Sequence, residues 1–163
     1  MPNFNVDIPP IPSNPLHQKF LQELFANKVQ SFLQYTFNCF VFSAENKAIS
    51  NTFWNIATDE LLHTKTLGFA LAKLGKTPIF CKENGTPITT RSILSNTTIK
   101  PTINNCVQQK ENNIIFIKTI LAKLSDVSTK NLVRGILKNE ECHLEILKNI
   151  DKIIKNGTNY LQS

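Results

Sequence analysis

Two segments of the chain repeat one pattern, Ile-x-x-x-Glu-x-x-His-x-x-x-Leu, at residues 56–67 and 136–147. Each copy lies within a longer series of residues spaced three or four apart, which is the spacing of one face of a helix. The first series is Ile49, Phe53, Ile56, Glu60, His63, Leu67, Ala70 and Leu74, and the second is Val133, Ile136, Glu140, His143, Leu147, Ile150 and Ile154. The pattern therefore predicts two core-facing helices that each bury an acid and an imidazole.

The rest of the sequence also favours helices. Only five glycines and one tryptophan occur, and long stretches contain neither glycine nor proline, which argues against a barrel or sandwich of short strands. A chain of 163 residues with 41% hydrophobic residues has the size of one folded domain with a proper core. Helices are predicted at about 16–42, 43–74, 102–124 and 128–156.

Capping residues set these predicted limits. Asn14 and Pro15 are a typical helix opening, with a cap residue followed by proline at the first helical position. Ser43 and Ser128 are the predicted caps of the second and fourth helices, and Gly157 is predicted to end the fourth.

The lengths of the connections predict the topology. Short links between the first and second helices, and between the third and fourth, make antiparallel neighbours. The link at 76–101 is rich in Thr, Ser, Pro and Asn, and its ~25 residues at ~3.3 Å each can run the length of a helix pair. We therefore expect an all-α four-helix bundle at 16–157 with one long crossover between helices 2 and 3, a Pro-rich extended arm at 1–15 and a tail at 158–163.

Glu60, His63, Glu140 and His143 are candidate metal ligands. A buried carboxylate and imidazole cost several kcal/mol unless they are paired or bound to a metal. Carboxylate oxygen and imidazole nitrogen together suit iron, manganese or zinc, and two such helices facing each other bring four ligands to one point. The alternative is a pair of buried Glu–His hydrogen bonds, but the internal repeat favours a metal-site origin. His17, the third histidine, is predicted at the surface.

Three segments resemble the ferritin-like superfamily, which includes bacterioferritins, rubrerythrins and manganese catalases. They are ANKVQSFLQYTF in the first predicted helix, ATDELLHTKTLGFALAKLGKTP in the second and LVRGILKNEECHLEILKNI in the fourth. The resemblance covers residues 16–75 and 102–157. It implies a dimetal site completed by one more glutamate from the first helix and one from the third, and a homodimer that pairs through the first two helices.

Lysine stands where that resemblance places the first-helix glutamate. The first helix has the core-facing series Leu21, Phe25, Lys28, Phe32, Tyr35, Cys39 and Phe42. An ammonium group between two buried glutamates would partly replace the missing cations. The alternative is that Lys28 extends toward the end of the bundle with only its stem buried. Glu23, the nearest acid, falls on the polar face with Lys19 and Gln30.

The third helix leaves its site residue open. One candidate series is Ile103, Val107, Lys110, Ile114, Ile117, Leu121 and Leu124. A second rotation places Gln109 inward, seven residues before Phe116, as the family spacing would have it. Neither offers a carboxylate, and Glu111 is a possible rescue ligand only with a shift of register. Gln109 and Lys110 are thus, with Lys28, the residues predicted to replace the missing acids.

The composition limits which cellular location and which kinds of binding partner we expect. The net charge of +6 comes from scattered lysines, without the dense basic run and interleaved aromatics of a nucleic-acid surface. No apolar run approaches the ~18–20 residues of a membrane span, and no secretory signal is recognisable. The four cysteines form no C-x-x-C pair, so reduced thiols and a cytoplasmic location are expected. Cys142 is expected to be a packed thiol.

Three functions are compatible with these patterns, and the sequence leaves open whether the protein is an enzyme. The first is a derived ferritin-like protein with a degenerate site, binding iron or manganese weakly or not at all, with a structural or regulatory role. The second is a working di-iron or di-manganese oxidoreductase acting on peroxide or oxygen. The third is a basic bundle that binds a partner or nucleic acid. A homo-oligomer, a dimer, is expected from the resemblance alone.

Overall fold

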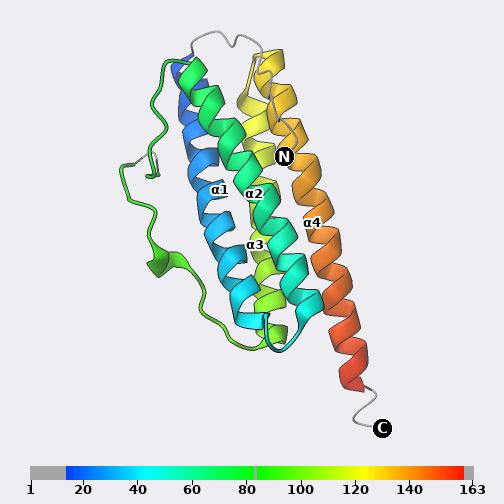
Figure 1. Cartoon of the computed structure of the whole chain (residues 1–163). Helices are drawn as coiled ribbons and strands as arrows, with labels where there is room; N and C mark the ends of the chain where they lie inside the picture. The colour runs from blue at the N-terminus through cyan, green and yellow to red at the C-terminus, as the bar shows by residue number, and fades with distance from the viewer. Residues whose placement is uncertain (1–13, 83, 160–163) are drawn as a thin grey trace, which may run out of the picture.

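The computed structural model describes residues 14–82 and 84–159, which form four long helices (Figure 1). The helices are α1 (Pro15–Phe42), α2 (Lys47–Lys73), α3 (Ile99–Lys123) and α4 (Val127–Asn159), and a short 3-10 helix, η1 (Thr90–Ser92), lies between α2 and α3. The protein is an all-α four-helix bundle, as the sequence predicts. The predicted N-terminal arm lies outside the described residues except for Asn14 and Pro15, and residues 158 and 159 of the predicted tail continue α4.

The long α2–α3 connection sets the direction of the helices. α1 and α2 run in opposite directions and pack side by side, as do α3 and α4 (Figure 1). The connection returns along the outside of α1, so α3 starts at the same end of the bundle as α2 and runs parallel to it (Figure 1). This is the single-crossover arrangement that the connection lengths predict. α4 continues past the ends of the other three helices (Figure 1).

Asparagine side chains cap the first two helices. Asn14 accepts hydrogen bonds from N–H groups of the first turn of α1, and Pro15 follows at the first helical position, as predicted. The predicted cap of α2 at Ser43 is wrong, because Ser43 has helical dihedral angles and closes α1 instead. Asn46 is extended, with φ of −146°, and its side chain accepts the N–H of Ile49 at 3.0 Å, so it caps α2.

The starts of α3 and α4 also differ from the predictions. α3 begins at Ile99, ahead of Pro101, because the first-turn N–H groups of a helix have no partner within the helix and a proline there removes no bond. α4 begins at Val127, and its cap is Asp126 in place of the predicted Ser128. The Asp126 carboxylate accepts the N–H of Thr129 at 2.7 Å and its hydroxyl at 2.8 Å. These two hydrogen bonds lower the pKa of Asp126.

Glycine ends one helix and not the other. Gly75 has φ of +76° and stops α2, because a positive φ is a conformation that glycine adopts without strain. Gly157 was expected to end α4, but it keeps a negative φ and the helix runs on to Asn159. A glycine alone therefore predicts a helix end less well than a glycine followed by a proline-rich connection.

The core consists of two apolar clusters with a polar layer between them. One cluster joins residues from the start of α1 and α4 to the ends of α2 and α3, including Leu21, Leu24, Phe25, Leu67, Leu71, Ile117, Ile120 and Val133. The other lies toward the opposite end and includes Tyr35, Phe42, Phe53, Ile56, Ile103 and Leu147. Charged residues interrupt the core on all four helices between these clusters.

His17 lies in the core, contrary to its predicted surface position. Its side chain is 2% exposed, and its Nε2 lies 3.3 Å from the N and 3.2 Å from the Oγ of Ser125 in the α3–α4 turn. That turn folds over the first turn of α1, a contact that the periodicity of α1 cannot indicate.

None of the helices formed by the described residues is both long and apolar enough to cross a membrane. All four cysteines are free thiols. Cys142 is exposed and does not pack as expected, because the outward face of α4 carries it.

Candidate metal centre

Four charged side chains meet in the polar layer, one from each helix. Lys28 comes from α1, Glu60 from α2, Lys110 from α3 and Glu140 from α4, and each is 0% exposed. The core-facing stripes predicted for α1, α2 and α4 bring three of them inward. We call these four residues the quartet.

Each ammonium group of the quartet contacts both carboxylates. Nζ of Lys28 lies 2.8 Å from Oε1 of Glu140 and 3.3 Å from Oε2 of Glu60. Nζ of Lys110 lies 2.5 Å from Oε1 of Glu60 and 3.0 Å from Oε2 of Glu140. All four carboxylate oxygens therefore face an ammonium group, and the quartet has no net charge when all four groups are ionised.

The electrostatics of the quartet favour the ionised forms. Burial alone would favour a protonated carboxyl, but the Lys110 and Lys28 ammonium groups outweigh it and hold the pKa of Glu60 well below its usual value. Burial alone would likewise favour a neutral amine, but the neighbouring Tyr35 hydroxyl and the Glu60 and Glu140 carboxylates, of which the carboxylates are the groups charged at neutral pH, raise the pKa of Lys110. The neighbouring acids and lysines thus keep each other charged inside the core.

The Lys110 ammonium group also contacts the ring of Tyr35. The ammonium group is 4.8 Å from the centroid of the tyrosine ring, within the range of a cation–π interaction. Burial raises the pKa of the Tyr35 hydroxyl, so the phenol stays neutral and the ring adds no charge to the quartet.

His63 and His143 flank the quartet and are almost fully buried, at 5% and 4% exposure. Nδ1 of His63 lies 3.6 Å from Oε2 of Glu60, and Nδ1 of His143 lies 4.0 Å from Oε1 of Glu140. Neither Nδ1 atom has a hydrogen-bond partner among the described residues. Both imidazoles thus point an unused nitrogen at the centre of the bundle.

The outer nitrogens of the two imidazoles are held across the α2–α4 interface. Nε2 of His143 lies 2.9 Å from Oδ2 of Asp59, and Nε2 of His63 lies 3.1 Å from Nδ2 of Asn139. Asp59 immediately precedes Glu60 and Asn139 immediately precedes Glu140, so each motif orients the histidine of the other. These two residues were not predicted as part of the site, although their equivalent places before the repeated glutamates were a usable signal.

A metal ion requires several ligand atoms close to one point, and three residues of the polar layer provide them. Glu60, Glu140 and His143 each offer a ligand atom within 4.8 Å of the others. The buried, unpartnered Nδ1 of His143 is the atom that a metal would use, because its Nε2 donates to Asp59, which is the usual way of orienting such a ligand. His63 is placed differently, because the Asn139 amide donates to its Nε2 and leaves the proton of the neutral ring on the inward Nδ1. The donor set by itself therefore resembles one half of a metal site.

The two lysines make the same space unsuitable for a pair of metal ions. Their ammonium groups already lie 2.5–3.3 Å from the carboxylate oxygens. Two divalent ions would bring four positive charges to a layer with two carboxylates and two ammonium groups, leaving a net charge of about +4 in a low-dielectric core. The residues present do not fit a dimetal centre while both lysines are protonated.

The remaining predicted site residues lie away from the quartet. Of the candidates on α3, only Lys110 faces the carboxylates. Glu111 pairs with Lys148 of α4 at 2.6 Å, with both side chains nearly half exposed, and Gln109 lines a cleft between α1 and α3. Glu23 of α1 is partly exposed and lines a second cleft. Among residues 14–82 and 84–159, these acids do not supplement Glu60 and Glu140.

No family model matches the sequence, and no curated protein matches it. Solved structures do match. Bacterioferritin from Desulfovibrio desulfuricans, a protein with a di-iron site, is similar over 90% of this chain and 84% of its own, with a TM-score of 0.78 and 20% identity. KatB, a manganese catalase from Anabaena, is similar over 86% of this chain and 74% of its own, with a TM-score of 0.75 and 20% identity.

Proposed function

From this ferritin-like fold, we propose that the protein is a bundle in which the lysine–glutamate quartet replaces a dimetal centre, so that metal binding is weak or absent. Its role is then structural or regulatory. One observation carries the proposal: both ammonium groups contact both carboxylates in a layer that solvent does not reach.

A metal ion at this layer would have to displace the two ammonium groups of the quartet. A divalent ion gains access to Glu60 and Glu140 only if the lysines lose their protons or leave the layer. The raised pKa of Lys110 opposes the first route, and the packing of a fully buried side chain opposes the second. The two lysines therefore act as the counter-ions that metal ions supply in a dimetal bundle.

Metal content tests this proposal directly. The protein is purified from medium supplemented with iron and manganese, and its metals are measured by elemental analysis. The D. desulfuricans bacterioferritin, prepared in the same way, is the positive control for loading. We expect well below one equivalent of metal per chain, and two equivalents of iron or manganese would overturn the proposal.

A second candidate is a metal site with oxidoreductase activity, and the convergence of Glu60, Glu140 and His143 favours it. The likeness to a di-iron bacterioferritin and to a manganese catalase adds support. This candidate requires a metal ion that displaces the ammonium groups, with further acids from a neighbouring subunit.

Peroxide consumption separates the two candidates. Rates are measured with iron or manganese added, for the wild type and for Glu60→Ala. Metal-dependent consumption that the substitution abolishes would support the oxidoreductase, whereas equal background rates in both proteins would exclude it.

A further inference from the structure

A cleft between α1 and α3 has walls of carboxamide side chains and a volume of about 220 Å³. We call it the carboxamide groove. Asn27, Gln30 and Gln34 line it from α1, and Gln109, Asn112 and Asn113 line it from α3, with Ser31 as the hydroxyl among them. None of the described residues that line this cleft is charged, although the chain has a net charge of +6. The lining therefore offers a ligand hydrogen bonds but no ion pair.

The same helix face shows what such side chains bind in this molecule. Gln34 binds the main chain of Leu94 twice: its Nε2 donates to the Leu94 carbonyl at 3.1 Å, and its Oε1 accepts the Leu94 N–H at 2.7 Å. Gln22, three turns earlier, donates to the carbonyls of Ile79 and Cys81 at 2.7 and 3.0 Å and accepts the Ile79 N–H at 3.4 Å. Carboxamides of α1 thus hold the extended crossover through its backbone.

The groove holds further carboxamides that lack such partners. Gln30, Gln109 and Asn112 make no side-chain hydrogen bond to any residue that the structure describes. Asn27 donates to Asn113 at 2.9 Å, but its own Oδ1 is buried and has no donor. A buried acceptor without a donor is unfavourable, so a ligand N–H that reaches the Asn27 oxygen would remove that penalty.

We propose that the carboxamide groove binds the main chain of an extended, uncharged peptide segment of a partner protein. An extended peptide offers N–H and C=O groups in alternation, which is what free carboxamides and the Asn27 oxygen complement. Three residues of extended chain span ~10 Å. The rise of α1 from Asn27 to Gln34 is also ~10 Å, so the groove fits a segment of this length. The inference is independent of the quartet and of any metal.

A neutral capped tripeptide tests the proposal on the full-length protein. The probe is N-acetyl-Ala-Ala-Ala-N-methylamide, titrated into 15N-labelled protein and followed by the side-chain amide signals of asparagine and glutamine. We expect saturable shifts at Gln30, Gln109 and Asn112. The same peptide with its backbone nitrogens methylated lacks the N–H donors, and we expect it to bind at least tenfold more weakly.

A pair of variants on α3 locates the site. Gln109→Leu is expected to weaken binding of the tripeptide at least fivefold, while Asn104→Leu, an exposed position outside the groove, leaves it unchanged. Equal shifts from both peptides would overturn the proposal, as would saturable shifts from a neutral disaccharide at the same positions. Absence of any shift at millimolar tripeptide would also overturn it. The comparison of peptides uses wild-type protein, so it holds even if a variant does not fold.

Discussion

Asp59 accepts a hydrogen bond from Nε2 of His143 across the α2–α4 interface, at 2.9 Å, so the inward Nδ1 of that histidine carries no proton when the ring is neutral. Burial and the charge of Lys110 lower the pKa of His143, which keeps the ring neutral at pH 7.

The first prediction is therefore that His143 is the Nε2–H tautomer at pH 7. Long-range 1H–15N correlation spectra distinguish the two ring nitrogens. Asp59→Asn is the control, because an amide at this position can also donate and relaxes the preference. A protonated Nδ1 in the wild type would contradict the orientation described for this imidazole.

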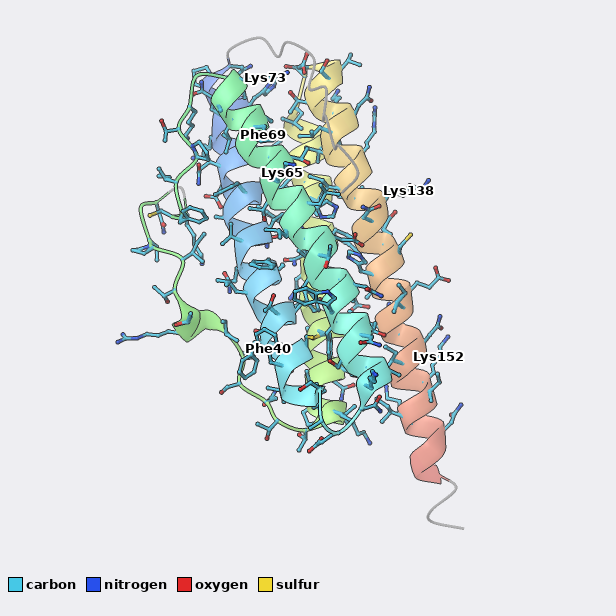
Figure 2. All side chains as sticks on the ribbon, in the orientation of Figure 1. Phe40, Lys65, Phe69, Lys73, Lys138 and Lys152 are labelled. Carbon is cyan, nitrogen blue, oxygen red and sulfur yellow. The ribbon has the colours of Figure 1, made fainter. Side chains whose placement is uncertain are left out.

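Removal of one ammonium group should destabilise the fold strongly. Lys28→Met leaves two buried carboxylates to share Lys110, and breaking a buried ion pair from one side costs about 3–5 kcal/mol. Urea unfolding followed by circular dichroism measures the change. Lys138→Met, at an exposed lysine of α4 (Figure 2), should change stability by less than about 0.5 kcal/mol.

A second variant tests whether the fold needs the four charges of the quartet in order to be stable. Replacement of all four charged residues by methionine removes the desolvation penalty together with the attraction. Such replacements of buried ion networks are often neutral or stabilising by about 1–4 kcal/mol. A quadruple variant less stable than Lys28→Met would contradict this account.

Stability should be highest from about pH 7 to about pH 10. The lowered pKa of Glu60 gives stability that is present above the unfolded carboxyl value of ~4.3 and is lost as the pH falls below it. The lowered pKa of His143 extends that loss upward, to begin below ~6.5. The raised pKa of Lys110 gives stability that is present below ~10.4 and is lost as the pH rises.

Urea unfolding across pH 3–12 measures this profile. Lys110→Met should remove most of the alkaline decline while it lowers the plateau. An alkaline decline of unchanged size in that variant would assign the effect to other groups.

Replacement of both lysines of the quartet by glutamate should create a metal site. In the double variant Lys28→Glu, Lys110→Glu the layer would hold four carboxylates and two imidazoles, whose charge of about −4 balances two divalent ions. We expect two equivalents of manganese or iron per chain by elemental analysis, and a thermal midpoint that rises with added manganese only in the variant. A folded variant without metal would show that the lysines are not what excludes it.

The homodimer expected from the sequence resemblance stays a prediction. Trp54, Leu61 and Phe69 are each about half exposed on the outer face of α2, and Phe69 lies there between Lys65 and Lys73 (Figure 2). Leu61→Glu should shift any dimer toward monomer in sedimentation velocity experiments. Ile115→Glu, at an exposed position of α3, is the matched control.

The fold was predictable because core-facing residues recur every three or four positions along the whole of each predicted helix. All eight residues of the α2 series are buried, since burial of one face is what the spacing encodes. The series through Lys28 also indicated an ammonium group between two glutamates. Side-chain caps such as Asn46 and Asp126 were missed because several nearby polar residues can cap a helix, and only the dihedral angles decide among them.

The rotation of α3 was not predictable from its sequence. Its side facing α1 is lined by Gln109, Asn112 and Asn113, so the polar face and the core face cannot be told apart by hydropathy. Lys110 and Gln109 were both candidates for the inward position, and only the partners of Lys110 on three other helices decide between them. Both features depend on contacts between elements distant in the sequence.

The balance of charges in the sealed layer also constrains how this chain can change. Lys28 and Lys110 are separate residues on different helices, and conversion of both to glutamate takes two substitutions. Either lysine turned to glutamate alone would confine three carboxylates with one ammonium group, a state more costly than the arrangement on either side of it. The quartet thus places an evolutionary barrier between this chain and a layer of four carboxylates, because each single substitution passes through the costlier state.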